Sequence, residues 1–140
     1  MNIVIYHNPD CGTSRNVLAL IRAAGGVPTV IPYLETGWTR PQLLGLFAAA
    51  DLTPRTALRE TKSPADELGL LDDDVSDATL LDAMVIHPVL VNRPIVCTRL
   101  GVRLCRPSET VLELLEQLPE TGFSKEDGTP VIDVEGRRVR

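Results

Sequence analysis

The feature that most constrains this chain is the segment of residues 4–17, where an apolar run leads to a single cysteine at the start of a predicted helix. The segment reads VIYHNPDCGTSRNV. Residues 3–7 predict a buried strand that ends at Asn8-Pro9, and residues 14–24 predict a helix. With a second strand at residues 27–33, this is a βαβ unit. Cys11 then lies at the carboxyl end of the first strand, where open α/β sheets place their ligands.

A cysteine at that point is expected to be reactive. The first turn of a helix leaves backbone N–H groups unpaired and carries partial positive charge, which favours a thiolate and can bind an oxyanion. The pKa of such a thiol falls from about 8.5 to roughly 3.5–7.5, especially beside Arg or His, and His7 and Arg15 are close in sequence. The alternative is a buried structural cysteine. Residues 12–14, Gly-Thr-Ser, argue against it because they would leave the sulfur poorly covered by apolar side chains.

Composition limits the partners. The chain has 140 residues, enough for one domain spanning 1–140 with a real core. A net charge of -5 and 4% aromatic residues argue against nucleic-acid binding by phosphate neutralisation or base stacking, so small molecules or proteins are the expected partners. The N-terminus enters a strand directly, with no leader and no apolar run near ~18 residues. We therefore expect a cytoplasmic protein without a membrane span.

The three cysteines, Cys11, Cys97 and Cys105, fit neither a disulfide framework nor a paired C-x-x-C zinc pattern. We expect no metal and no bound cofactor. Cys105 is interpreted as a small buried residue and Cys97 as peripheral.

In the rest of the chain, predicted helices are followed by two predicted strands and a last helix, and this order predicts a mixed α/β fold. Residues 40–50 form a helix after Thr39, residues 52–71 form short helices and turns, and residues 76–87 form a helix with Ser76 as N-cap. Strands at 95–98 and 102–105 make a hairpin, followed by a helix at 108–118 with Ser108 as N-cap.

This order predicts a thioredoxin-like fold, in which a βαβ half and a ββα half share one mixed β-sheet with flanking helices. The core covers about 1–118, and a helical insertion at about 39–87 separates the halves. The polar tail, 119–140, pairs weakly through 131–134 or stays mobile.

The loop at residues 11–14 is a C-x-x-S, which lacks the second thiol that would resolve a mixed disulfide. Resolution then needs an outside thiol, or Cys97 or Cys105. The phosphatase loop C-x5-R is excluded because Val17 stands six residues after Cys11.

Positive charge for an oxyanion must therefore come from elsewhere, and three arginines, Arg59, Arg93 and Arg106, are candidates. Arg93 and Arg106 fall at predicted strand boundaries near the active end of the sheet, and the guanidinium fork suits a tetrahedral oxyanion. Taken singly, each is more often a solvated group or the partner of a carboxylate. The Arg93-Pro94 bond is a candidate cis peptide, with an ordinary trans proline as the alternative.

Four ordered motifs carry a resemblance: YHNPDCGTSRN at residues 6–16, NRPIV at 92–96, LCRPSE at 104–109 and FSKEDG at 123–128. Together they resemble the glutaredoxin-coupled arsenate reductases of the thioredoxin-like superfamily. The resemblance implies that the Cys11 thiolate attacks arsenate, that glutathione forms a mixed intermediate, and that glutaredoxin takes up the glutathione as arsenite leaves. It also implies anion binding by Arg59, Arg93 and Arg106, and support of the thiolate by His7 and Ser14.

The resemblance therefore implies arsenate, glutathione as co-substrate and glutaredoxin as partners, and we expect a monomer. Two other functions stay open. One is a redox-sensing regulator that binds RNA polymerase, although such proteins typically use C-x-x-C. The other is a general glutathione-dependent thiol reductase.

Overall fold

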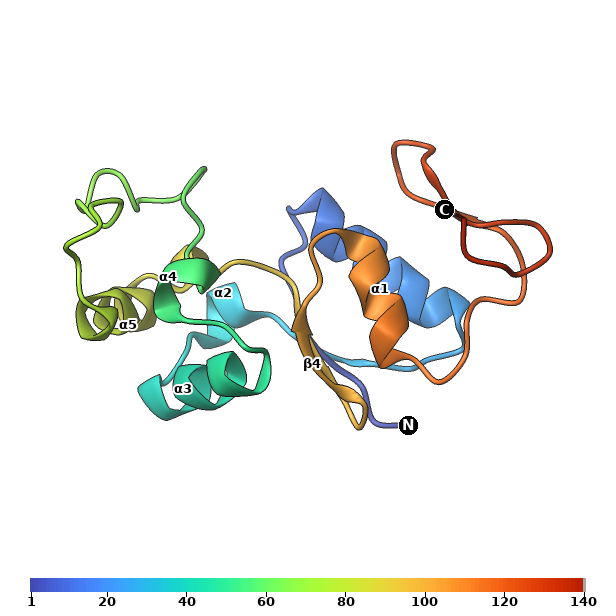
Figure 1. Ribbon diagram of the computed structural model, residues 1–140, viewed down its shortest axis with the longest axis horizontal. Helices are drawn as coiled ribbons and strands as arrows, with labels where there is room; N and C mark the ends of the chain where they lie inside the picture. Colours follow the sequence, from blue (N-terminus) through green and yellow to red (C-terminus); the bar gives the residue numbers. More distant parts are fainter. Residues whose placement is uncertain (140) are drawn as a thin grey trace. The chain divides into compact units, whose positions relative to one another are not determined.

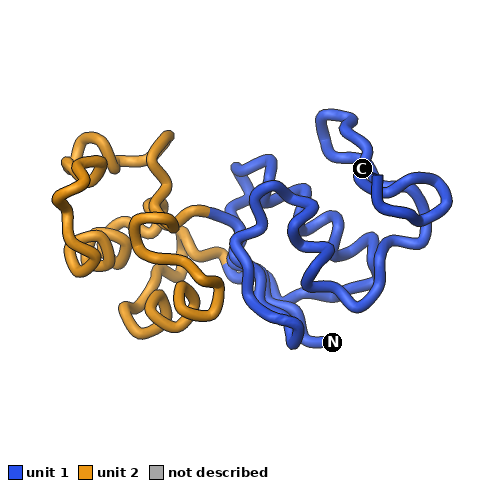
Figure 2. Tube along the Cα trace, in the orientation of Figure 1, with its two compact units in different colours: residues 1–31, 93–140 blue, residues 32–92 orange. Residues whose placement is uncertain are grey.

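The computed structural model describes residues 1–139, so Arg140, the last residue of the predicted tail, lies outside the described residues. The chain divides into two compact units, coloured separately in Figure 2. One comprises Met1–Ile31 and the chain from Arg93 onward, and the other is Pro32–Asn92. Within residues 1–139, the helices are too short or too polar to cross a bilayer.

The first unit contains a four-stranded mixed sheet. Its strands are β1 (Val4–Tyr6), β2 (Thr29–Ile31), β3 (Ile95–Thr98) and β4 (Gly101–Leu104), in the order β2-β1-β3-β4. β1 pairs in parallel with β2 and antiparallel with β3, which in turn pairs antiparallel with β4. The parallel pair is joined through α1 (Gly12–Ala23). This arrangement confirms the predicted thioredoxin-like fold.

The sheet register decides where the cysteine loop lies. Tyr6, the last residue of β1, is opposite Ile95, the first residue of β3. The loop after β1 and the segment before β3 therefore meet at one edge of the sheet. The β3–β4 turn lies at the opposite edge, because Thr98 is paired with Gly101 there.

The core of this unit forms where α1 packs on the sheet beside η2 (Ser108–Leu114), as Figure 1 shows. Val17, Leu20 and Ile21 form the buried face of α1, at the helical spacing that the sequence shows. They join Ile3 and Ile5 from the β1 segment in one cluster of buried side chains. Removing these aliphatic side chains from water is the main contribution to the stability of the unit.

One helix prediction was wrong in type. Residues 108–118 were expected to form an α-helix capped by Ser108, but the structure has a 3-10 helix, η2, that follows Pro107, and no side chain caps it. Three of its four buried residues, Ser108, Val111 and Leu114, are spaced by three, which matches three residues per turn; the fourth is Leu112. Ser108 is itself 3% exposed and belongs to the packed face.

The second unit is helical. It contains α2 (Tyr33–Thr36), α3 (Arg40–Ala49), α4 (Pro54–Ala57), α5 (Asp77–Ile86) and the 3-10 helix η1 (Pro88–Leu90). The predicted N-cap Ser76 is confirmed, and Thr39, which precedes the helix predicted at 40–50, caps α3 in the same way. Each hydroxyl accepts a hydrogen bond from the backbone N–H three residues later. The strand predicted to extend to residue 33 is shorter, because α2 begins there.

The C-terminal residues form a two-stranded hairpin, β5 (Phe123–Ser124) with β6 (Pro130–Ile132). The expected pairing through 131–134 is therefore correct for its first two residues. Val131 and Ile132 are 3% and 2% exposed and belong to the core cluster, whereas Val134 is 87% exposed. Apolar burial thus attaches this hairpin to the first unit.

Candidate active site

The loop between β1 and α1 is shaped by Asn8. Its side-chain oxygen accepts a hydrogen bond from the Asp10 N–H at 2.9 Å, and its carbonyl accepts one from the Cys11 N–H at 3.1 Å. These contacts close a tight turn of the kind that asparagine favours. Cys11 is the N-cap of α1, with extended backbone angles, and its carbonyl accepts from the Arg15 N–H at 3.0 Å. The cysteine therefore lies at the helix N-terminus, as predicted.

Cys11 is more covered than residues 12–14 suggested. It is 6% exposed, yet it is not a member of the apolar core cluster. Its sulfur accepts a hydrogen bond from Arg106 Nη1 at 3.7 Å. The covering therefore includes a cationic side chain that arrives from far along the sequence, which residues 12–14 could not reveal.

The surroundings of Cys11 favour the thiolate. Burial alone would raise the pKa of the thiol, but the Ser14 backbone N–H, the positive charge of Arg93, and hydrogen bonds from Arg106 and Arg93 outweigh it. The pKa of Cys11 is accordingly lower than that of an ordinary cysteine. A helix N-terminus and neighbouring guanidinium groups are the two usual causes of such a change.

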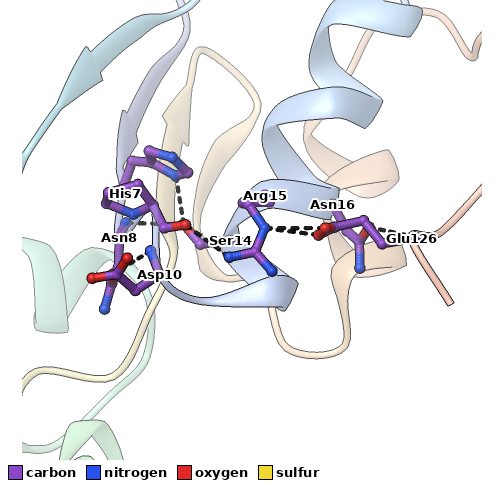
Figure 3. A network of polar contacts seen from close by, with 8 residues as sticks. His7, Asn8, Asp10, Ser14, Arg15, Asn16 and Glu126 are labelled. Carbon is purple, nitrogen blue, oxygen red and sulfur yellow. Dashed lines mark hydrogen bonds and ion pairs between the residues drawn. The ribbon is translucent and has the colours of Figure 1, made fainter.

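His7 and Ser14 form a buried polar pair beneath the loop. His7 Nδ1 and Ser14 Oγ are 2.6 Å apart, and Ser14 Oγ also accepts from the Asn8 N–H at 3.1 Å (Figure 3). The pKa of His7 is lowered by burial and by the charges of Arg22 and Arg15, so a neutral imidazole is favoured near pH 7. The pair therefore holds the loop through hydrogen bonds, with Ser14 linking β1's end to the first turn of α1.

Arg93 and Arg106 meet Cys11 at the same edge of the sheet. Both precede cis prolines, at Arg93-Pro94 and Arg106-Pro107. The first was a candidate cis bond in the sequence, with a trans proline as the alternative, and the second was missed. The Pro94 carbonyl accepts from the Cys105 N–H at 2.9 Å, and the Arg93 carbonyl accepts from Arg106 Nη1 at 3.1 Å. The two arginine segments are thereby tied together beside the sulfur.

Arg59 belongs to the other compact unit. Its backbone N–H donates to the Leu90 carbonyl at 2.8 Å, and its Nε donates to the Thr61 carbonyl at 3.1 Å. Its participation in the site stays a prediction from the resemblance.

The other two cysteines differ from Cys11. Cys105 is fully buried in the core cluster, as expected, and burial raises the pKa of its thiol to about 12. Cys97 is half-buried on β3, where burial also raises the pKa. All three cysteines are free thiols. Only Cys11 combines a helix N-terminus with cationic neighbours.

One residue that shapes the loop, Glu126, was not singled out from the sequence. Glu126 in the C-terminal hairpin binds Arg15 Nε through both carboxylate oxygens, at 2.8 and 3.0 Å, and Arg15 Nη1 donates to the Pro9 carbonyl at 2.8 Å. Arg15 was named from the sequence as a cationic neighbour of the thiol, and in the structure its guanidinium is held by Glu126 and the Pro9 carbonyl. The only sequence signal for Glu126 was its place in the FSKEDG motif.

Comparison with known proteins decides the family. Residues 6–114 match the model of the ArsC family. The chain belongs to the ArsC family. An ArsC relative from Synechocystis sp., "Arsenate reductase ArsI2", is 71% identical over 137 residues, covering 98% of each chain. The "Arsenate reductase" of Escherichia coli strain K12 is 53% identical over 139 residues, covering 99% of each chain.

Solved ArsC structures share the fold. The arsenate reductase from Vibrio cholerae superposes with a TM-score of 0.77 at 43% identity, covering 82% of this chain and 98% of that one. A putative arsenate reductase from Yersinia pestis gives a TM-score of 0.74 at 38% identity, covering 79% and 98%. The family resemblance drawn from the four motifs is therefore confirmed.

Proposed function

We propose that this protein reduces arsenate to arsenite, with Cys11 as the nucleophile and glutathione and glutaredoxin as the source of electrons. The observation that carries the proposal is the position of the Cys11 sulfur, which lies at the N-terminus of α1 and 3.7 Å from Arg106 Nη1. Family membership and the names of the relatives that cover almost the whole chain support arsenate as the substrate.

Arsenate binds as an oxyanion. Arg93 and Arg106 offer guanidinium donors beside the thiol, and the N–H groups of the first turn of α1 offer backbone donors. The resemblance adds Arg59 as a third guanidinium. Positive charge at this point serves twice, because it binds the anion and also keeps the sulfur ionised.

The reaction then proceeds through thiol exchange at arsenic. The Cys11 thiolate forms an S–As bond and an oxygen leaves as water after protonation. Glutathione replaces a second oxygen, again released as water. A glutaredoxin thiolate attacks the glutathione sulfur, the S–As bond to glutathione breaks, and its electron pair reduces As(V) to As(III). Water finally releases arsenite from Cys11, and glutaredoxin carries the glutathione as a mixed disulfide.

The internal cysteines are poor candidates for resolving the Cys11 adduct. Ser14 occupies the place of a resolving thiol, and its hydroxyl is bound to His7 and Asn8. Cys105 is 0% exposed with a pKa of about 12, and burial also raises the pKa of Cys97, so both thiolates are scarce at neutral pH. An external thiol is therefore favoured, and glutathione is the class that the resemblance implies.

A coupled assay tests the proposal. Arsenate-dependent NADPH consumption, with glutathione, glutaredoxin and glutathione reductase present, should be abolished in Cys11→Ser and retained in Cys97→Ser. Turnover that persists in Cys11→Ser would refute the assigned nucleophile. An inactive Cys97→Ser would indicate an internal disulfide route. If the wild type leaves arsenate unreduced but reduces glutathionylated peptides, the protein is a general thiol reductase.

A further inference from the structure

The tip of the C-terminal hairpin is a defined turn. Between β5 and β6, the Lys125 N–H donates to the Thr129 carbonyl at 2.8 Å, and the Gly128 N–H donates to the Lys125 carbonyl at 2.9 Å. Gly128 has a φ of 89°, which glycine adopts without strain. The buried side chains of β6 fix the base of this hairpin in the core. Lys125 and Glu126 are therefore presented from an anchored support.

These two neighbouring residues contact two different elements. Glu126 binds Arg15 through its carboxylate, and its backbone N–H donates to Asn16 Oδ1 at 3.0 Å (Figure 3). Lys125 Nζ binds both carboxylate oxygens of Glu109, at 2.8 and 3.2 Å. One side chain thus holds the first turn of α1, and the other holds the first turn of η2.

The two elements are those that bring the thiol and the guanidinium together. Arg15 follows Cys11 by one helical turn and also binds the Pro9 carbonyl, so it spans the loop on both sides of the sulfur. Glu109 follows Arg106 by three residues, in η2. The hairpin tip therefore bridges the segment that carries Cys11 and the segment that carries Arg106.

Loss of these two ion pairs is expected to weaken the Arg106–Cys11 contact more than it lowers the stability of the fold. The Arg15 and Glu126 side chains are 46% and 50% exposed, and exposed ion pairs contribute little to stability. The Lys125 and Glu109 side chains are less exposed, at 17% and 29%, so loss of that pair has the larger effect on stability. The Arg106–Cys11 contact, at 3.7 Å, is at the long end of a hydrogen bond to sulfur and weakens with small displacements of either segment.

We propose that Lys125 and Glu126 are positioning residues, which hold the Cys11 loop and the Arg106 segment at the separation that the thiolate requires. The proposal rests on the proposed function for its relevance to arsenate reduction. Each acts through a partner in the neighbouring element, Glu126 through Arg15 and Lys125 through Glu109.

The opposite charges of the two residues allow a sharp test. If they acted on Cys11 only through their own charges, removing Glu126 would lower the thiol pKa and removing Lys125 would raise it. If they act by positioning, both Glu126→Ala and Lys125→Ala raise it, because both loosen the Arg106–Cys11 contact. We expect each to move the pH midpoint of Cys11 alkylation upward by about 0.5, a loss of about threefold in rate at one pH unit below the wild-type midpoint.

The experiment measures iodoacetamide alkylation of the Cys11 peptide by mass spectrometry, across pH, in the full-length protein. Glu135→Ala is the matched control. It removes an exposed carboxylate that lies just after β6 and pairs with Arg137. Upward shifts in both test variants, with the control unchanged and every variant shown by urea unfolding to be folded under the assay conditions, support the proposal. Shifts of opposite sign, no shift in either variant, or an equal shift in the control overturn it.

The outcome is separable from that of the proposed function. A wild-type Cys11 that titrates at an ordinary value would remove the basis of the proposed function. A low wild-type midpoint that neither variant changes would overturn the positioning role alone.

Discussion

Replacing Arg106 by glutamine should raise the pKa of Cys11 by at least about 0.7. Arg106 Nη1 lies 3.7 Å from the Cys11 sulfur, and Arg106 is an exposed residue. In the dielectric of water two unit charges at that separation attract by about 1 kcal/mol, and the attraction is larger here because Cys11 is 6% exposed. Since one pKa unit corresponds to about 1.4 kcal/mol, the lost attraction becomes the stated rise.

The assay for this prediction follows alkylation of the Cys11 peptide against pH in both proteins. Arg106→Lys keeps the positive charge but loses the guanidinium fork, so we expect a smaller rise in the pKa of Cys11 than in Arg106→Gln. Arg99→Gln is the control, because Arg99 pairs with Glu116 and lies just after β3, at the edge of the sheet opposite the Cys11 loop. An unchanged midpoint in Arg106→Gln, or an equal rise in Arg99→Gln, would refute the reasoning.

Three further predictions concern stability, each measured by urea unfolding under reducing conditions. The pKa of Cys11 is lowered in the folded chain, so the stability of the wild type relative to Cys11→Ser should depend on pH. The stability difference should rise with pH up to the ordinary thiol pKa and be lost as the pH falls through the folded-state pKa. A difference that does not change with pH would contradict the lowered pKa. Ser14→Ala leaves the buried Asn8 N–H without its acceptor and should lower the free energy of unfolding by about 1–3 kcal/mol. An unchanged free energy would mean that the His7–Ser14 pair does not stabilise the loop. Gly26→Ala places a Cβ 2.9 Å from side chains of the core and 3.0 Å from a backbone oxygen, so it should lower the free energy of unfolding by about 1–3 kcal/mol. Gly45→Ala in α3 places a Cβ that meets nothing within 4 Å, so it should raise the free energy of unfolding by about 0.5–1 kcal/mol. The reverse order would show that the packing around Gly26 relaxes.

Local sequence patterns predicted the parts of the site that form locally. The apolar strand, the Asn-Pro break and the helix that follows placed Cys11 correctly, because each depends on neighbours within a few residues. The strands of the hairpin, the N-cap Ser76 and the start of the helix after Thr39 were predicted for the same reason.

Contacts between segments far apart in the sequence were harder to predict from local sequence patterns. Arg15 and Glu126 are 111 positions apart, and no spacing rule links them. Arg106 reaches Cys11 from 95 positions away, and its place in the site was inferred from strand boundaries and from the resemblance. The type of η2 was missed because a short apolar segment with residues spaced by three also satisfies part of the α-helical pattern.

The most direct test of the account is a thiolate titration of the wild-type protein, read as the absorbance near 240 nm that Cys11→Ser lacks. The account predicts a difference signal that titrates below the ordinary pKa of a cysteine, because the helix N-terminus and the two guanidinium groups outweigh burial. A signal that titrates at or above the ordinary value would contradict the claim that Cys11 is held ready as a nucleophile.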